Sequence, residues 1–131
     1  MRVRDAMVSD PRTLAPTATA QEAARLLVRP EVGAVIVCDA GRLVGLVTRS
    51  ALLERVVAAG RDPRATTLAE IVEGDILTVE AETGIEDAYR MLEDTDYERV
   101  PVVEQGRLVG VLHRSALQRR LAEDEEPEAA Q

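Results

Sequence analysis

The stretch GRLVGLVTRSAL, residues 41–52, decides the fold because the chain contains a second, nearly identical copy of it. Residues 106–117 read GRLVGVLHRSAL, so nine of the twelve positions are identical at an offset of 65 residues. Carried back without a gap, the same offset pairs Thr13 with Thr78 and Val35 with Val100. Self-similarity at a fixed spacing indicates two copies of one structural unit.

Each copy has the pattern of a β-α-β-β-α unit. A short extended segment (12–15; 77–81) precedes a helix with apolar residues at positions i, i+3, i+4 and i+7. Thr19 with Glu22, and Thr83 with Glu86, predict a capping box at the start of each helix. Two apolar runs follow (34–38 and 43–47; 100–103 and 108–112), separated by a turn with glycine at the positive-φ position. A closing helix ends the copy (49–59, stopped by Gly60; 114–122).

The repeat predicts an α/β (α+β) fold of two tandem units. We expect unit one over residues 1–60, a polar linker over 61–67, unit two over 68–122 and a disordered acidic tail over 123–131. Two units cannot form an open solenoid, which needs about three or more repeats. We therefore expect them to pack around a pseudo-twofold axis, with a ligand site in the cleft between the copies.

Composition argues against several classes of function. The formal charge is −8, but five acids lie in the last ten residues, and all sixteen basic residues are arginine. With two aromatic residues and no basic excess, we expect no nucleic-acid binding. No apolar run is long enough for a membrane span or a secretory signal, which predicts a cytoplasmic protein without membrane contact. The single cysteine, Cys38, lies in an apolar run, and with one histidine in the chain we expect no metal site.

The repeated motif, preceded by an apolar strand that ends in Asp39 or Glu104, resembles the hallmark of the cystathionine-β-synthase (CBS) domain family. The resemblance covers about residues 3–122, and residues 3–7 and 68–72 resemble the family's short lead-in helix. It implies a pair of CBS domains that binds AMP, ATP or S-adenosylmethionine in the clefts between its units. It implies no required cofactor.

The family's ribose signature after the hairpin is G-x-x-[ST]-x-x-D, in which a carboxylate accepts hydrogen bonds from the ribose hydroxyls. The first copy keeps the glycine and the hydroxyl and lacks the carboxylate, and the second copy keeps only the glycine. Arg99 stands where family members place a phosphate-binding base, and its counterpart is Ala34. The resemblance thus implies a ligand site formed by Thr13, Gly45, Thr48, Ala51, Thr78, Arg99, Gly110, His113 and Ala116.

Several of these residues have a second interpretation. Thr48 is also suited to be a helix N-cap, and Arg99 to pair with a nearby acid such as Glu98. His113 is typical of a polar residue where a helix begins, although its titration would make ligand binding pH-sensitive. The repeated Arg49 and Arg114 are expected to cover the surface. Because Thr48 is retained, an aspartate at Ala51 is expected to tighten nucleotide binding more than one at position 116.

These patterns predict a free-standing regulatory module that senses an adenosine-containing ligand with weakened ribose recognition, and that acts on an unidentified protein. The alternative is a ligand-free dimeric interaction protein. No catalytic dyad or phosphate-binding glycine loop is present in the sequence, so we expect no enzyme. A homodimer is expected from the apolar faces of the closing helices, which carry Leu52, Leu53, Val56, Val57, Ala116, Leu117 and Leu121.

Overall fold

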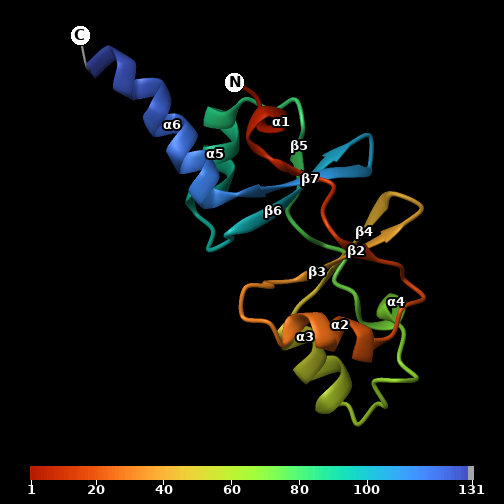
Figure 1. Ribbon diagram of the computed structural model, residues 1–131. Coiled ribbons are helices and arrows are strands. Elements are labelled where there is room, and N and C mark those ends of the chain that lie inside the picture. Colours follow the sequence, from red (N-terminus) through yellow and green to blue (C-terminus); the bar gives the residue numbers. More distant parts are fainter. Residues whose placement is uncertain (130–131) are drawn as a thin grey trace. The chain divides into compact units, whose positions relative to one another are not determined.

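The computed structural model describes the backbone of residues 1–129 and the side chains of residues 1–123 (Figure 1). The chain divides into two compact units. Arg12–Ile76 form one, which we call the β3–β4 unit. Met1–Pro11 and the chain from Leu77 onward form the other, the β6–β7 unit.

The β3–β4 unit follows the predicted β-α-β-β-α order. β2 pairs in parallel with β3, and β3 pairs antiparallel with β4. A single antiparallel bridge between Leu46 and Glu73 extends the sheet beyond β4. Its elements are β2 (Thr13–Leu14), α2 (Ala20–Leu27), β3 (Val35–Asp39), β4 (Arg42–Val47), α3 (Arg49–Leu52), the π-helical η1 (Leu53–Val57) and α4 (Leu68–Ile71).

The β6–β7 unit repeats this order with longer strands. β5 pairs in parallel with β6, β6 pairs antiparallel with β7, and β1 pairs antiparallel with the far side of β7. Its elements are α1 (Val3–Ala6), β1 (Val8–Ser9), β5 (Val79–Glu80), α5 (Ile85–Glu93), β6 (Arg99–Glu104), β7 (Arg107–His113) and α6 (Arg114–Ala129). Two tandem units of mixed α and β structure are therefore confirmed.

Both hairpins close through two residues that have positive φ. Gly41 and Gly106 have φ values of 84° and 80°, as the sequence predicted for a glycine in the turn. Ala40 and Gln105 share the left-handed region, with φ values of 51° and 54°. Two consecutive positive φ angles give the tight turn whose twist matches that of the flanking strands.

The lead-in helices are exchanged between the sequence copies. Val3 of α1 is completely buried in the core of the β6–β7 unit, with Val102, Leu112 and Leu117. Leu68 of α4 is completely buried in the core of the β3–β4 unit. Each compact unit thus contains the lead-in that precedes the other copy in the sequence, so the compact units and the sequence repeats do not have the same boundaries.

Hydrogen bonds and ion pairs hold each exchanged lead-in. The backbone N–H groups of Val3 and Arg4 donate to the carbonyls of Thr83 and Ala81. Arg4 also pairs with Glu82 at 2.9 Å and with Glu104. In the other unit, Arg55 donates to the Ile71 carbonyl at 2.8 Å and pairs with Glu73 at 3.1 Å. These contacts join segments that are far apart in the sequence, which is why the repeat did not reveal them.

The structure corrects two local predictions. Thr83 and Glu86 form no capping box, because α5 begins at Ile85 with Gly84 as its N-cap. Such a box is present at α4 instead, between Thr67 and Glu70. The Thr19 hydroxyl does accept from the Glu22 N–H at 3.2 Å, which is one of the two hydrogen bonds of the capping box predicted for α2.

The closing helices also differ from expectation. α6 continues to Ala129, so the backbone of 123–129 is helical where a disordered tail was expected, and residues 130–131 lie outside the described residues. Four of these seven residues are glutamate, which has high helix propensity. Of the apolar residues expected on an open helix face, Val56 and Leu117 are buried in the cores, and Leu53 and Val57 are exposed.

Candidate functional site

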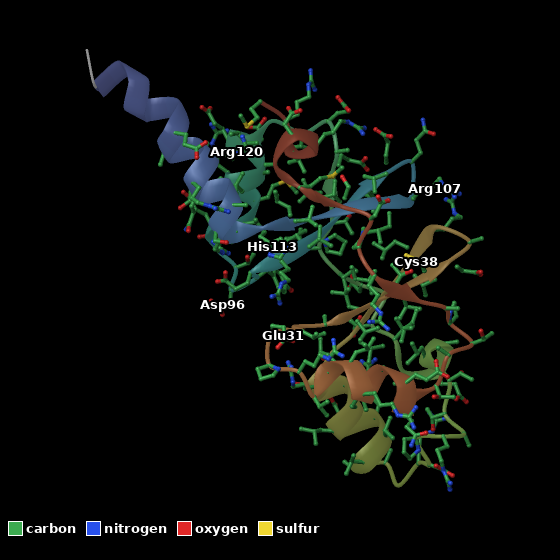
Figure 2. All side chains as sticks on the ribbon, viewed as in Figure 1. Glu31, Cys38, Asp96, Arg107, His113 and Arg120 are labelled. Carbon is green, nitrogen blue, oxygen red and sulfur yellow. The ribbon has the colours of Figure 1, made fainter. Side chains whose placement is uncertain are left out.

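In the β6–β7 unit, two basic residues of the predicted ligand site lie opposite each other in the hairpin. Arg99 begins β6 and His113 ends β7, and the two residues are direct cross-strand partners. Figure 2 shows His113 where β7 passes into α6, with Arg107 at the other end of the same hairpin. Directly opposed residues of an antiparallel pair lie close enough for their side chains to interact.

Burial, and secondarily the positive charge of Arg99, lower the pKa of His113 below its ordinary value. Both causes disfavour the imidazolium form. The imidazole is therefore neutral near pH 7, and an anion held beside it would favour its protonation. Arg99 is exposed at this position and supplies a permanent charge.

The corresponding place in the β3–β4 unit has no cation. Val35 and Val47, the first residue of β3 and the last of β4, are partners there, and Ala34 and Thr48 lie immediately outside the two strands. Thr48 is the N-cap of α3, where its hydroxyl accepts from the Ala51 N–H at 3.2 Å. The N-cap interpretation of Thr48 is confirmed, and its contact with a ligand stays a prediction.

Ala51 and Ala116 occupy the positions where the family resemblance places an aspartate, and the two have different surroundings. Ala51 is only 8% exposed, whereas Ala116 on α6 is half-buried. A carboxylate at position 51 would lose most of its hydration, which is costly without a paired charge. Position 116 leaves more contact with water and lies in the unit that contains Arg99 and His113. This favours position 116 over position 51 for an added aspartate, the reverse of the order expected from the sequence.

The two motif glycines have a structural role. A Cβ at Gly45 would lie 2.1 Å from the Glu73 carbonyl oxygen, and one at Gly110 would lie 2.6 Å from the Met7 sulfur and 2.8 Å from the Val8 carbonyl oxygen. Each glycine therefore lets the exchanged lead-in cross directly over its strand. Their absent side chains are needed for this close approach.

The two repeat-paired threonines lie where the first strand of each unit runs. Thr13 begins β2 and is the parallel partner of Ile36, and Thr78 immediately precedes β5. Both are half-buried. The structure thus places Thr78, Arg99, Gly110, His113 and Ala116 in one unit, and the remaining four predicted residues in the other.

The repeated arginines bind backbone carbonyls and do more than cover the surface. Arg114 donates to the carbonyls of Leu92 and Thr95 at 2.7 Å each, and to that of Tyr97 at 2.9 Å. Arg49 donates to the carbonyls of Arg29 and Val32 at 2.7 Å each. Each guanidinium thereby fixes the loop between a helix and the strand that follows it. Their identity in the repeat was the signal for this role, which sequence reasoning missed.

The thiol of Cys38 is not activated as a nucleophile. Cys38 is buried, and desolvation raises the pKa of its thiol, which disfavours the reactive thiolate. Among the side chains that the structure describes, residues 1–123, no cluster of three or more His, Cys, Asp and Glu residues could hold a metal ion. The helices in the described part of the chain are all too short or too polar to cross a membrane.

Comparison with known proteins gives two consecutive matches to one family. The CBS domain profile matches residues 3–58 and 68–123. The CBS domain-containing protein YhcV of Bacillus subtilis is 33% identical over 110 residues, which cover 84% of this chain and 78% of YhcV. Hypoxic response protein 1 of Mycobacterium tuberculosis is 31% identical over 121 residues, which cover 92% of this chain and 85% of that protein.

Solved structures show the same architecture. The crystal structure of Hypoxic Response Protein I with two coordinated zinc ions has a TM-score of 0.79 at 29% identity, covering 92% of this chain and 98% of its own. The crystal structure of CBSX2 in complex with AMP, a protein of Arabidopsis thaliana, has a TM-score of 0.75 at 27% identity. That alignment covers 95% of this chain and 98% of CBSX2.

Proposed function

This chain belongs to the CBS-domain family, and we propose that it is a regulatory module whose β6–β7 unit binds a phosphate-bearing adenosine ligand such as AMP. The observation that carries the proposal is the cross-strand pair of Arg99 and His113. Arg99 provides a permanent charge for the phosphate, and His113 provides one that forms when the anion arrives. The AMP complex of the related CBSX2 supports an adenine nucleotide as the ligand.

Binding is weak because the ribose carboxylate is missing. Ala116 stands where the family resemblance places an aspartate, so the ribose hydroxyls lack a charged acceptor. A hydrogen bond to a charged group contributes about 1.5–3 kcal/mol, which corresponds to roughly a ten- to hundredfold change in affinity. A weak site responds to a ligand only at high concentration, which suits a sensor of an abundant metabolite.

Calorimetric titration of AMP and of uncharged adenosine tests the phosphate contact. Arg99→Gln should weaken AMP binding about tenfold and leave adenosine binding unchanged, because only AMP carries the phosphate. Arg107→Gln is the matched control, since Arg107 is an exposed arginine on the same hairpin at its opposite end. Equal losses in the two variants would argue for a general effect of charge and against a phosphate site at Arg99.

Ala116→Asp tests the ribose contact in the opposite direction. It should tighten AMP and adenosine binding alike, by roughly tenfold or more, because both ligands carry the ribose. Ala51→Asp is the comparison, and it should lower the melting temperature because residue 51 is buried.

A ligand-free interaction protein is the second candidate function. It is favoured by the alanines at positions 51 and 116, neither of which offers a polar side chain to a nucleotide. No heat of binding with AMP, ADP, ATP or adenosine, in the wild type and in Ala116→Asp alike, would support it and refute the sensor.

A further inference from the structure

The stretch that leads into α6 is positively charged, although the unit that contains it is acidic. The β6–β7 unit holds 16 of the chain's 24 acidic residues and 8 of its 16 arginines, so it carries the whole net charge of −8. Residues 105–122 of this unit nevertheless contain four arginines, the single histidine and no Asp or Glu. They run from the hairpin turn into the first turns of α6. The surroundings of Ala116 in the sequence are therefore basic.

The two units differ in charge around this stretch, and each difference makes the β6–β7 unit more positive. At the 65-residue offset, a basic residue replaces a neutral or acidic one, or a neutral residue replaces an acidic one. The four pairs are Arg99 with Ala34, His113 with Thr48, Arg119 with Glu54, and Val8 with Glu73. Changes that all run in one direction favour a ligand with more than one anionic group.

Arg120 is the cation that loses its carboxylate partner in this comparison. Its counterpart Arg55 donates to the Ile71 carbonyl at 2.8 Å and pairs with Glu73 at 3.1 Å. The β6–β7 unit has Val8 at the position of Glu73, and Arg120 takes part in none of the ion pairs between described residues. Figure 2 shows Arg120 on α6, where the residue is half-buried. Its guanidinium can therefore offer a full charge to an anion.

Helix geometry brings Arg120 over Ala116. The two residues are four positions apart on α6, which places them on one face, and helical side chains lean towards the N-terminus of their helix. The Arg120 side chain therefore covers the turn that contains Ala116. His113 directly precedes α6, and in the other unit the corresponding Thr48 hydroxyl reaches the Ala51 N–H at 3.2 Å. Ala116 thus lies between two basic residues along the helix.

We infer that the ligand of the β6–β7 unit carries a second phosphate on its ribose, at the 2′ or the 3′ oxygen, and that Arg120 binds this phosphate. The inference rests on the proposed function, which puts the ribose beside Ala116. In dinucleotide-binding folds, a carboxylate selects the free ribose hydroxyl, whereas a nearby arginine accommodates a ribose phosphate. Ala116 removes the negative charge that would repel the second phosphate, and Arg120 supplies the positive charge that binds it.

Calorimetric titration of AMP, adenosine 2′,5′-bisphosphate and adenosine 3′,5′-bisphosphate tests the inference. The wild type should bind one bisphosphate about tenfold or more tightly than AMP, because the added contact is a hydrogen bond between charged groups. The preferred bisphosphate shows which ribose oxygen carries the phosphate. A wild type that binds AMP and gains nothing from either bisphosphate would overturn the inference and leave the proposed function intact. No binding of any of the three nucleotides would refute both.

Variants separate the ribose phosphate contact from a general attraction of anions. The measured quantity is the ratio of bisphosphate affinity to AMP affinity, which Arg120→Gln should reduce to about one. Arg120→Lys should keep part of the preference, because it retains the charge. Arg107→Gln is the matched control, since it removes the same charge at the far end of the hairpin and should keep the wild-type ratio. Equal ratios in Arg120→Gln and Arg107→Gln would contradict the assignment.

Ala116→Asp should invert the preference. The new carboxylate would accept hydrogen bonds from the ribose hydroxyls of AMP and would repel the second phosphate of the bisphosphate. This variant should therefore bind AMP more tightly than the wild type does, and the preferred bisphosphate more weakly. A preference for the bisphosphate that survives Ala116→Asp would show that the second phosphate lies elsewhere. Unchanged melting temperatures of the variants establish that folding is intact.

Discussion

The β3–β4 unit and the β6–β7 unit keep the same framework and differ in their charges. Each has a glycine where the lead-in crosses its strand, and each has an arginine that fixes the loop after α2 or after α5. The cross-strand pair of Arg99 and His113 in one unit has Ala34 and Thr48 as counterparts in the other. The difference teaches that the repeated residues maintain the unit, whereas the residues that vary determine what each unit can bind.

The largest loss of stability is expected from replacing the two glycines where the lead-ins cross the strands. Gly45→Ala should lower the free energy of unfolding by about 3 kcal/mol, because the new methyl group would overlap the Glu73 carbonyl, which is rigid backbone. Gly110→Ala should lower it less, by about 2 kcal/mol, since the Met7 side chain there is flexible and the nearest backbone atom, the Val8 carbonyl oxygen, would lie at 2.8 Å instead of 2.1 Å. Urea unfolding of the two variants checks the order. Equal losses would show that the two crossings are equally tight.

The next largest losses of stability are expected from replacing the repeated arginines. Arg114→Ala should lower the free energy of unfolding by about 2 kcal/mol, because it leaves three backbone carbonyls without this donor. Arg49→Ala should lower it by about 1 kcal/mol, since it frees two carbonyls near the surface. Denaturant titration with Arg→Lys controls at both positions separates the hydrogen bonds from the charge. A larger loss at position 49 would contradict this ranking.

A smaller effect, about tenfold in affinity, is expected from pH. The pKa of His113 is lowered in the free protein, and a bound phosphate would raise it, so AMP binding should take up a proton. Affinity should therefore rise as the pH falls from about 7.5 to about 6. His113→Thr gives this position the residue of the other unit and should flatten the profile relative to the wild type. Because the phosphate of AMP titrates in the same range, the comparison is made between the two proteins, and parallel profiles would contradict a role for His113.

The same lowered pKa affects stability in a defined direction. Its folded-state value lies below the unfolded value of about 6.5, so the unfolded chain binds the proton first. The stability of the free protein should therefore decline as the pH falls below about 6.5, and it should decline less in His113→Thr. Thermal unfolding across this range supplies the measurement.

The smallest effect is expected from the end of α6. Deleting residues 123–131 should change the free energy of unfolding by less than about 1 kcal/mol, because the segment contains no large apolar residue. Leu121, which packs against the core of the β6–β7 unit, is retained. Deletion from residue 121 onward is the contrasting variant and should destabilise more. A drop of many degrees in melting temperature for the shorter deletion would show that the segment contributes to folding.

Sequence reasoning predicted the repeated β-α-β-β-α order, the glycine turns and the Thr19 cap, because each depends on residues close together in the chain. It failed at Thr83, where the correct residue types for a capping box lie one position too early for the start of α5. Arg99 and His113 were singled out separately, but their opposition across the hairpin depends on strand register. The cleft between α5 and α6 was missed because the residues that line it come from two helices about thirty positions apart.

The sequence by itself determined that one unit is built twice, since a repeat of this length specifies the same local structure in both copies. Only the tertiary structure decided which lead-in completes which unit. Val3 and Leu68 are apolar residues that either core could accept by composition, and chain connectivity does not choose between them. The choice depends on contacts between distant segments, where the lead-in crosses Gly110 or Gly45 and its backbone finds partners on the other copy.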